Sequence, residues 1–209
     1  MTAVSTTLAI VLTFSVLAAL AALPIAHLSA REGGNLPTLF ERASYVGYAV
    51  PGVVIAIALV SLGSQTPILG SLYGSAVLAF PLLLFAYVVR FLPQAVGSTR
   101  ASILRVSPAL PEAARSLGRS PLGAFRSVTL PLIAPGQVGG AALVFLTTMK
   151  ELPATLLLRP LGFETFVTYI WQVQEQGYYG QAAVPALILV AVSALSMLII
   201  LKGDQYDVT

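Results

Sequence analysis

The sequence contains no cysteine, a single histidine and few charged residues, and each shortage excludes a class of protein. Without cysteine, the chain can hold no disulfide framework, thiolate metal site or cysteine nucleophile. The lone His27 cannot build a multi-histidine metal site. Charged residues make up 9% of the chain and hydrophobic residues 57%, whereas soluble domains carry about 25% charged residues. Because so few charges cannot cover a water-facing surface, we expect lipid to cover much of the protein.

Long hydrophobic runs are plentiful, and roughly 20 apolar residues in a helix suffice to cross the hydrocarbon layer. No basic residue precedes the first run, and that run is too long for a secretory signal, so we expect it to remain as a span. The sequence predicts an all-α membrane protein with a single domain over residues 1–209. The expected spans are 7–28, 44–63, 72–92, 136–158 and 182–201, and the longest connection is the loop 93–131. Gly136 and Gly140 have the spacing that lets two helices pack closely.

The basic residues predict how these spans are oriented. Nine of the eleven Lys and Arg residues fall in the connection after the first span, in or at the edge of the connection after the third, or in the tail. Such residues concentrate on the cytoplasmic side of membrane proteins. We therefore expect a bacterial inner membrane protein with its N-terminus outside and its C-terminus in the cytoplasm. An outside start without a preceding span is unusual, so we expect Met1 to be internal to a longer gene product, with a lost span as the alternative.

Residues 162–180 carry many aromatic side chains on the predicted outer side. Phe163, Phe166, Ile170 and Val173 recur near helical spacing, which predicts an amphipathic helix along the outer membrane interface. This helix is either part of an aromatic belt at headgroup level or a landing surface for an external partner.

A spaced motif lies in the loop 93–131. Glu112, Ala113 and Ala114 are followed after three residues by Gly118, and nine residues later come Val128, Thr129, Leu130 and Pro131. Ser107 is suited to cap a helix here, and Pro108 is tolerated in its first turn. Glu112 near the helix start is favoured by the helix dipole, and Gly118 permits a left-handed turn that ends the helix. The sequence therefore predicts a rigid helix of two turns outside the membrane.

The motif resembles the EAA motif of binding-protein-dependent ABC importer permeases, with Val128 where isoleucine is typical. A chance amphipathic surface helix is the alternative. Two further stretches, 48–54 and 149–160, look like ferric-iron importer permeases, which commonly carry two similar halves, and this chain resembles the second half. The resemblance implies a type I permease fold with a cytoplasmic coupling helix. The residues it assigns to ATPase coupling are Glu112, Ala113, Ala114, Gly118, Val128, Leu130 and Pro131.

The same resemblance implies the partners and the solute. The expected partners are an ABC ATPase subunit, an extracytoplasmic substrate-binding protein, the lipid bilayer, and either a second permease half or a homodimer partner, with no nucleic acid. Iron(III) is the expected solute, and thiamine, an aminophosphonate, sulfate or molybdate are the alternatives. Arg115 and Arg119 would form charge pairs with the ATPase or anchor the helix to anionic lipid.

The chain has no G-x-x-x-x-G-K-[ST] phosphate loop, since its only lysines are Lys150 and Lys202. We therefore expect a transport subunit without an ATPase site or a cofactor of its own, with ATP bound by the partner. An intramembrane enzyme would need a catalytic cluster, which the sequence does not offer. A passive channel or a membrane scaffold would have no need of the coupling motif.

Two adjacent charges interrupt the fourth hydrophobic run. The span either ends at Lys150 or continues over 136–158, and we favour the longer span because Leu152 to Leu158 is too apolar for a solvated loop. Charges at that depth are costly and usually face a polar interior or a partner. Lys150, Glu151 and Pro153 are therefore candidates for the translocation path, with a structural ion pair to another span as the alternative.

Overall fold

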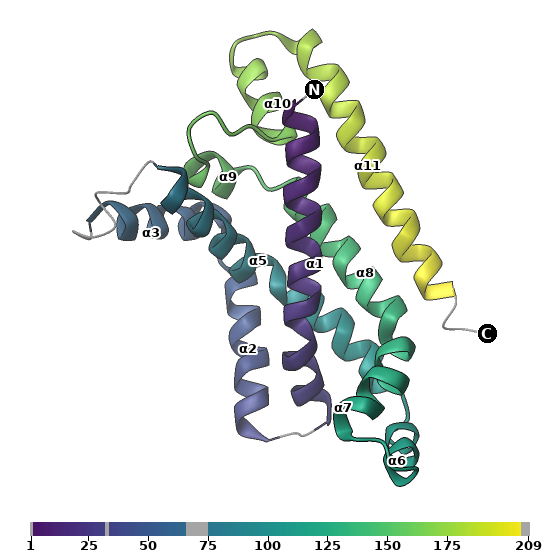
Figure 1. Ribbon diagram of the computed structural model, residues 1–209. Coiled ribbons are helices and arrows are strands. Elements are labelled where there is room, and N and C mark those ends of the chain that lie inside the picture. The colour runs from purple at the N-terminus through teal and green to yellow at the C-terminus, as the bar shows by residue number, and fades with distance from the viewer. Residues whose placement is uncertain (1, 32–33, 66–74, 206–209) are drawn as a thin grey trace.

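A computed structural model describes residues 2–31, 34–65 and 75–205, and these residues form helices joined by turns (Figure 1). The all-α prediction is confirmed for this part of the chain. The helices are α1 (Thr2–Arg31), α2 (Asn35–Ala49), α3 (Gly52–Gln65), α5 (Ala76–Arg105), α6 (Ala109–Ser116), α7 (Pro121–Ala124), the π-helical turn η1 (Phe125–Thr129), α8 (Leu130–Met149), α9 (Pro153–Leu158), α10 (Phe166–Glu175) and α11 (Tyr179–Gln205).

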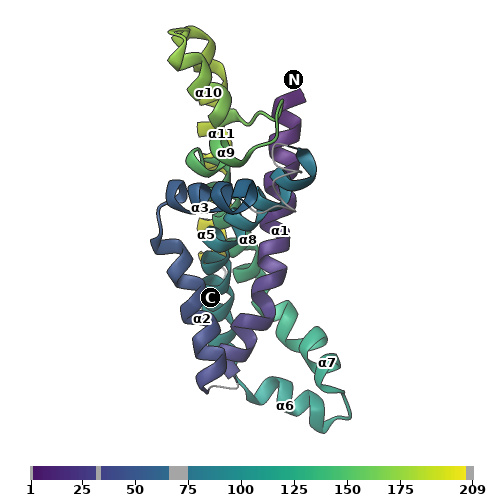
Figure 2. The ribbon, with the colours of Figure 1, turned by 90° about the vertical axis from the view of Figure 1, so that its left-hand side faces the viewer.

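Four of these stretches are long and apolar enough to cross a membrane. They are Thr7–Arg31, Val77–Arg105, Pro121–Met149 and Tyr179–Leu198, and the bent pair α2 and α3 would supply a fifth if it forms one span. α6 and α7 lie at one end of the bundle, while α10 and the N-terminus lie at the other (Figures 1 and 2). The coupling motif and the aromatic segment are therefore separated by the length of the bundle.

Small residues bring the central helices α1, α5 and α8 together. Ala22, Ala86 and Ala95 are completely buried where these helices pack, and Phe14 and Leu83 fill the space beside them. Small side chains let helix backbones approach closely. Such close van der Waals packing holds membrane helices together, because lipid is as apolar as the helix surface and the hydrophobic effect does not drive their association. The core thus combines alanines, where helix backbones come close, with larger apolar side chains that fill the space between the helices.

The predicted close packing at Gly136 and Gly140 is confirmed. A Cβ atom added to Gly136 would collide with the Ser102 side chain on α5, and one added to Gly140 would lie 3.1 Å from the Ser98 Cβ. The Ser98 hydroxyl also donates a hydrogen bond of 2.8 Å to the Gly136 carbonyl. The glycines therefore let α5 and α8 meet at backbone distance.

The second expected span, 44–63, is bent in its middle. α2 and α3 meet at 99°, with Val50 in an extended conformation at the bend. Pro51 explains this break, because proline has no N–H to continue the helix and disfavours helical geometry in the residue before it.

The third expected span, 72–92, is too short, and its residues 72–74 lie outside the described part of the chain. α5 continues to Arg105, so the loop predicted to begin at residue 93 starts as helix. Val96, Thr99 and Ile103 are buried at helical spacing on one face, and this amphipathic face holds the extension against the bundle.

The fourth expected span, 136–158, ends early. α8 stops at Met149, and the separate short helix α9 begins at Pro153. The prediction of a continuous helix was therefore wrong. The ring of Pro153 would clash with the carbonyl four residues earlier, at Met149, which ends the helix there. The amides of Lys150 and Glu151 instead bond carbonyls three residues back, at 3.3 and 3.1 Å.

The aromatic segment forms a helix that packs on its own chain. α10 starts after Thr165, whose hydroxyl accepts a hydrogen bond from the Thr168 amide at 3.3 Å. Its apolar residues Phe166 and Val173 are buried, whereas Trp171 is exposed. The apolar stripe expected to face the membrane interface therefore faces the protein, and Phe163 lies before the helix begins.

Candidate functional site

The first half of the motif forms the helix α6, as expected from its sequence. Pro108 occupies the N-cap position without a side-chain cap, and the Ser107 carbonyl accepts a hydrogen bond from the Leu110 amide at 3.2 Å. The Pro108 carbonyl accepts a hydrogen bond from the Glu112 amide at 3.3 Å, and Glu112 lies in the first turn, where the helix dipole favours a carboxylate. α6 has eight residues, which corresponds to the two turns predicted.

Gly118 ends this helix in the predicted left-handed conformation, with φ of 88°. The Gly118 amide bonds the Arg115 carbonyl at 3.0 Å, and the Arg119 amide bonds the Ala114 carbonyl at 3.1 Å. Together these bonds form a Schellman motif, which satisfies the last helix carbonyls and needs a residue that tolerates positive φ. Gly118 thus lies at the one position after the alanine pair where this helix end requires a residue with positive φ.

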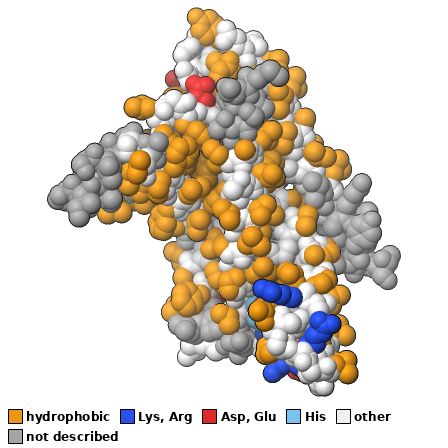
Figure 3. Space-filling model, in the orientation of Figure 1, with side chains coloured by type: hydrophobic (Ala, Val, Ile, Leu, Met, Phe, Trp, Pro, Cys, Tyr) orange, Lys and Arg blue, Asp and Glu red, His pale blue; other side chains and the backbone are white. Residues whose placement is uncertain are grey.

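None of the side chains of α6 is buried in the chain. Leu117, directly after it, is 87% exposed, and the nearby Leu110 and Leu122 are 48% and 57% exposed. Lys and Arg side chains gather around this end of the molecule (Figure 3). An exposed helix flanked by apolar and basic side chains, with no packing role inside the chain, is suited to contact another protein.

The second half of the motif lies where η1 passes into α8. Thr129 is buried, Val128 and Leu130 are half-buried, and Pro131 is exposed in the first turn of α8. Glu112 and Thr129 line the same cavity of about 470 Å³, which also borders His27, Arg31 and Phe125. The two halves of the motif, separated in sequence, therefore meet between α6 and the bundle.

Arg31 ties the end of α1 to the segment that leads into α6. Its guanidinium donates hydrogen bonds to the carbonyls of Ile103 at 3.0 Å and Val106 at 2.5 Å. These carbonyls lie at the C-terminus of α5, where a cation is favoured by the helix dipole. Because this segment leads into α6, a movement of α6 would displace the ends of both α1 and α5.

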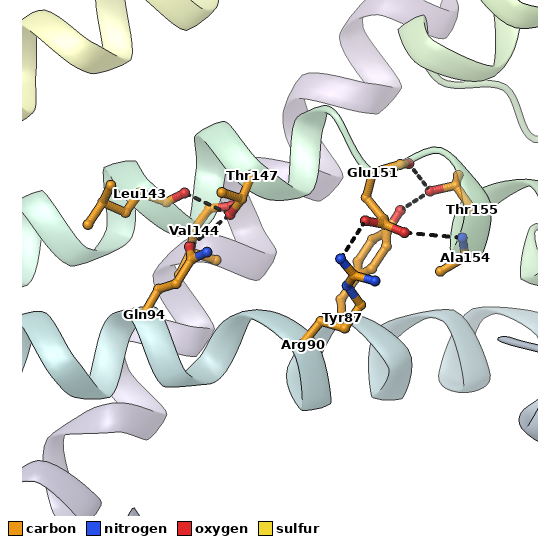
Figure 4. A network of polar contacts seen from close by, with 9 residues as sticks. All are labelled: Tyr87, Arg90, Gln94, Leu143, Val144, Thr147, Glu151, Ala154 and Thr155. Atoms are coloured by element: carbon orange, nitrogen blue, oxygen red, sulfur yellow. Dashed lines mark hydrogen bonds and ion pairs between the residues drawn. The ribbon is translucent and has the colours of Figure 1, made fainter. Parts of the chain in front are cut away.

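The second group of candidate residues belongs to a polar network inside the bundle (Figure 4). The Glu151 carboxylate forms an ion pair of 3.5 Å with Arg90 on α5 and accepts a hydrogen bond of 3.2 Å from the Ala154 amide. Glu151 is buried and directed at these partners, so the structure shows the ion pair with another helix that was the alternative for this residue.

Tyr87 and Thr155 extend this network. The Thr155 hydroxyl donates to the Glu151 carbonyl at 2.5 Å, and the Tyr87 hydroxyl lies 2.6 Å from the Thr155 hydroxyl oxygen. Since the Thr155 proton is already used, Tyr87 donates this bond. The network thus joins α5 to the start of α9 through four side chains, those of Tyr87, Arg90, Glu151 and Thr155, across the break that follows α8.

Gly52 completes the network by leaving space for it. A Cβ at this position would collide with the Arg90 guanidinium and lie 2.5 Å from the Glu151 carboxylate. The bend between α2 and α3 therefore packs directly against the ion pair of Arg90 with Glu151. Sequence analysis missed both Gly52 and Arg90, although an arginine within the apolar stretch after Ala76 was a signal that it needs a partner.

Lys150 and Pro153, the other candidates for the path, lie apart from this network. The Lys150 side chain is exposed beside α11, and Pro153 is exposed at the start of α9. Within residues 2–31, 34–65 and 75–205, no group of three or more His, Cys, Asp or Glu side chains is arranged to hold a metal ion.

Comparison with known proteins places the chain in a family. The profile of the family described as "binding-protein-dependent transport system inner membrane component" matches residues 16–202. The chain therefore belongs to this family of multi-pass membrane proteins. It is 35% identical over 188 residues to the Fe(3+)-transport system permease protein FbpB 2 of Haemophilus influenzae, covering 90% of this chain and 36% of that protein.

A second relative is the putative 2-aminoethylphosphonate transport system permease protein PhnV of Salmonella paratyphi A. It is 30% identical over 156 residues, which cover 74% of this chain and 56% of that protein. The chain thus spans about a third to somewhat over half of the length of these relatives.

The fold also has a solved counterpart. The structure of the MetNI methionine ABC transporter in an inward-facing conformation matches with a TM-score of 0.69 and 21% identity, over 98% of this chain and 92% of that chain. The predicted type I importer permease fold is therefore confirmed.

Proposed function

We propose that this chain is the membrane-spanning permease part of an ATP-driven importer, and that α6 docks in a separate ATPase subunit. The observation that carries the proposal is α6 itself, because it buries none of its side chains within the chain yet has a precisely ended helical form. A rigid exposed helix of this kind is suited to transmit movement from a partner to the spans. Glu112, Ala113, Ala114 and Gly118 are the residues that would enter the partner.

Within the chain, this movement would be transmitted by the second half of the motif, which supplies Val128, Leu130 and Pro131. They lie where η1 continues into α8, and Leu130 packs against the buried core. α6 packs against α7 and η1, and α7, η1 and α8 follow one another without a break, so a push on α6 would pass into α8. In the proposed cycle, ATP closes the ATPase dimer, α6 moves with it, and the spans open to the outside, while hydrolysis returns them. The ATPase supplies the free-energy difference between the two states.

We propose two further partners. An extracytoplasmic binding protein would deliver the solute, and a second permease half or a second copy of this chain would complete the path. We place the α6 end in the cytoplasm and the α10 end outside, since the basic side chains gather around α6 (Figure 3).

Iron(III) is the solute we propose. The relative named for Fe(3+) transport matches more of this chain, at higher identity, than the relative named for 2-aminoethylphosphonate. An aminophosphonate is the second candidate, supported by that other relative. ATP-dependent uptake of radioactive iron(III) and of labelled 2-aminoethylphosphonate by the assembled transporter in proteoliposomes, each with its own binding protein, decides between them.

Docking by α6 can be tested with two glycines that share a conformation. Gly118 and Gly162 both have positive φ, at 88° and 77°, and nothing surrounds the position of a Cβ at either. Alanine strains both turns equally, but Gly162 lies in the connection between α9 and α10, away from α6. We expect Gly118→Ala to reduce co-purification of the ATPase and Gly162→Ala to leave it unchanged. Equal recovery of the ATPase with both variants would contradict the assignment of α6.

A further inference from the structure

The adjacent residues Lys150 and Glu151 point into different surroundings. Glu151 is buried against Arg90, whereas Lys150 is exposed. Lys150 takes no part in the ion pairs of Arg90 with Glu151 and of Arg100 with Glu41. The Lys150 ammonium group is therefore left to interact with something other than the described carboxylates of this chain.

Lys150 also lies deep along the bundle. It shares a groove with residues 189–197 of α11, which belong to the candidate span Tyr179–Leu198. At 1.5 Å per residue, these positions are roughly 15 to 27 Å along the helix axis from Tyr179. These positions run from the middle of the candidate span to its penultimate residue, so a lysine side chain in this groove does not reach the headgroups on the outer side, and an ammonium group facing lipid near mid-span is strongly disfavoured.

The groove itself has a volume of about 430 Å³ and is apolar apart from two groups. One is the Lys150 ammonium. The other is Ser193, whose hydroxyl oxygen is buried and has no hydrogen-bond partner in the described part of the chain. Leu146, Leu189 and Met197 supply the apolar walls. A mostly apolar hollow with a few polar groups is the usual form of a small-molecule site, and a cation with a hydroxyl group is suited to an anion.

We propose that Lys150 faces the translocation path and binds the transported solute as an anion, with the Ser193 hydroxyl as a second donor. This inference rests on the proposed importer function and specifies the charge of its cargo. A phosphonate meets the requirement directly. A bare iron(III) ion would be repelled by Lys150, so iron would cross as a complex with net negative charge.

The absence of cysteine makes a direct test available, because one introduced cysteine is then the only thiol of the chain. Lys150→Cys removes the charge, and aminoethyl methanethiosulfonate restores a positive group of nearly the length of lysine. Sulfonatoethyl methanethiosulfonate attaches a negative group instead. Leu195→Cys is the matched control, because Leu195 is 60% exposed at similar depth on a face of α11 outside the groove.

The measurement is ATP-dependent uptake of labelled iron(III) citrate and of 2-aminoethylphosphonate by the complete transporter in proteoliposomes. We expect Lys150→Cys to raise the KM for the transported solute about tenfold or more. The aminoethyl reagent should restore uptake, the sulfonatoethyl reagent should abolish it, and neither should affect Leu195→Cys.

Three results would overturn the proposal. Unchanged or faster uptake by Lys150→Cys would show that the cation does not bind the solute. Equal effects of the two reagents would show that charge is irrelevant. Loss of the second membrane subunit from purified Lys150→Cys, with no reaction at the thiol, would show that Lys150 pairs with a carboxylate of that subunit. Failure of the importer function itself would appear separately, as absence of ATP-dependent uptake with the unaltered chain.

Discussion

The helix α6 and the network around Glu151 are built in opposite ways. α6 buries no side chain, and the bonds that end it join residues at most five positions apart. The Glu151 network is buried and joins α5 to the segment after α8, with Tyr87 and Thr155 separated by 68 positions. The comparison shows that α6 adds little to the stability of the bundle and is left free to contact a partner, whereas the network holds broken helices together.

The largest effect on stability is expected when the ion pair loses one partner. Glu151→Leu leaves the Arg90 guanidinium without its carboxylate in a largely buried position, and the Ala154 amide loses its acceptor. Removing one partner of a buried pair costs about 3 to 5 kcal/mol. Thermal unfolding of the purified transporter in detergent measures the loss. The double variant Arg90→Leu/Glu151→Leu should recover much of it, and a double variant as unstable as Glu151→Leu would show that the pair is not the cause.

A smaller loss is expected at the bend between α2 and α3. Gly52→Val places side-chain atoms where the Arg90 guanidinium and the Glu151 carboxylate lie. Overpacking of this kind costs about 1 to 3 kcal/mol. Gly139→Ala is the matched control, since its Cβ would lie 4.0 Å from the nearest atom outside its own helix, the Ser98 hydroxyl oxygen. Equal unfolding temperatures for the two variants would remove Gly52 from the network.

The hydrogen bond between α5 and α8 is expected to contribute less. Ser98→Ala removes the donor to the Gly136 carbonyl but keeps the Cβ that packs on Gly140. Hydrogen bonds between membrane helices contribute about 0.6 kcal/mol on average. The unfolding temperature should fall slightly, and a loss as large as that of Gly52→Val would mean that the hydroxyl has a role beyond this bond.

The smallest effect on stability is expected at Leu117, where the effect on binding should be large. Because Leu117 is 87% exposed, Leu117→Ala should change the stability of the bundle by less than about 0.5 kcal/mol. Truncation of an interface anchor costs at least about 1.4 kcal/mol, which is tenfold in affinity. Titration of the ATPase against the detergent-solubilised permease measures this, and unchanged affinity would exclude Leu117 from the docking surface.

The contrast between local and long-range structure also explains what the sequence could predict. The ends of α6 depend on Pro108 and Gly118 and on bonds within one helical turn or two, so its length and its left-handed end were predictable. The same holds for the approach of α5 at Gly136, which follows from residue size. In each case the cause lies in neighbouring residues or in the absence of a side chain.

The positions of the breaks were harder to predict because their causes are distant in sequence. Pro51 and Pro153 were visible, but proline is also tolerated inside α1 at Pro24 and inside α11 at Pro185. Whether a proline breaks a helix or remains inside one also depends on the surrounding structure, such as the ion pair that occupies the space beside Gly52. The ion pair of Arg90 was not predictable, because its partner, Glu151, is supplied by another part of the chain.

The proposed function requires that the α6 end of the bundle faces the cytoplasm, where a separate ATPase can reach it. It is tested most directly by a single cysteine at Leu117, in the otherwise cysteine-free chain, exposed to a membrane-impermeant maleimide on intact spheroplasts. We expect Leu117→Cys to react only after the membrane is opened. Full reaction from the outside of the sealed membrane would contradict it.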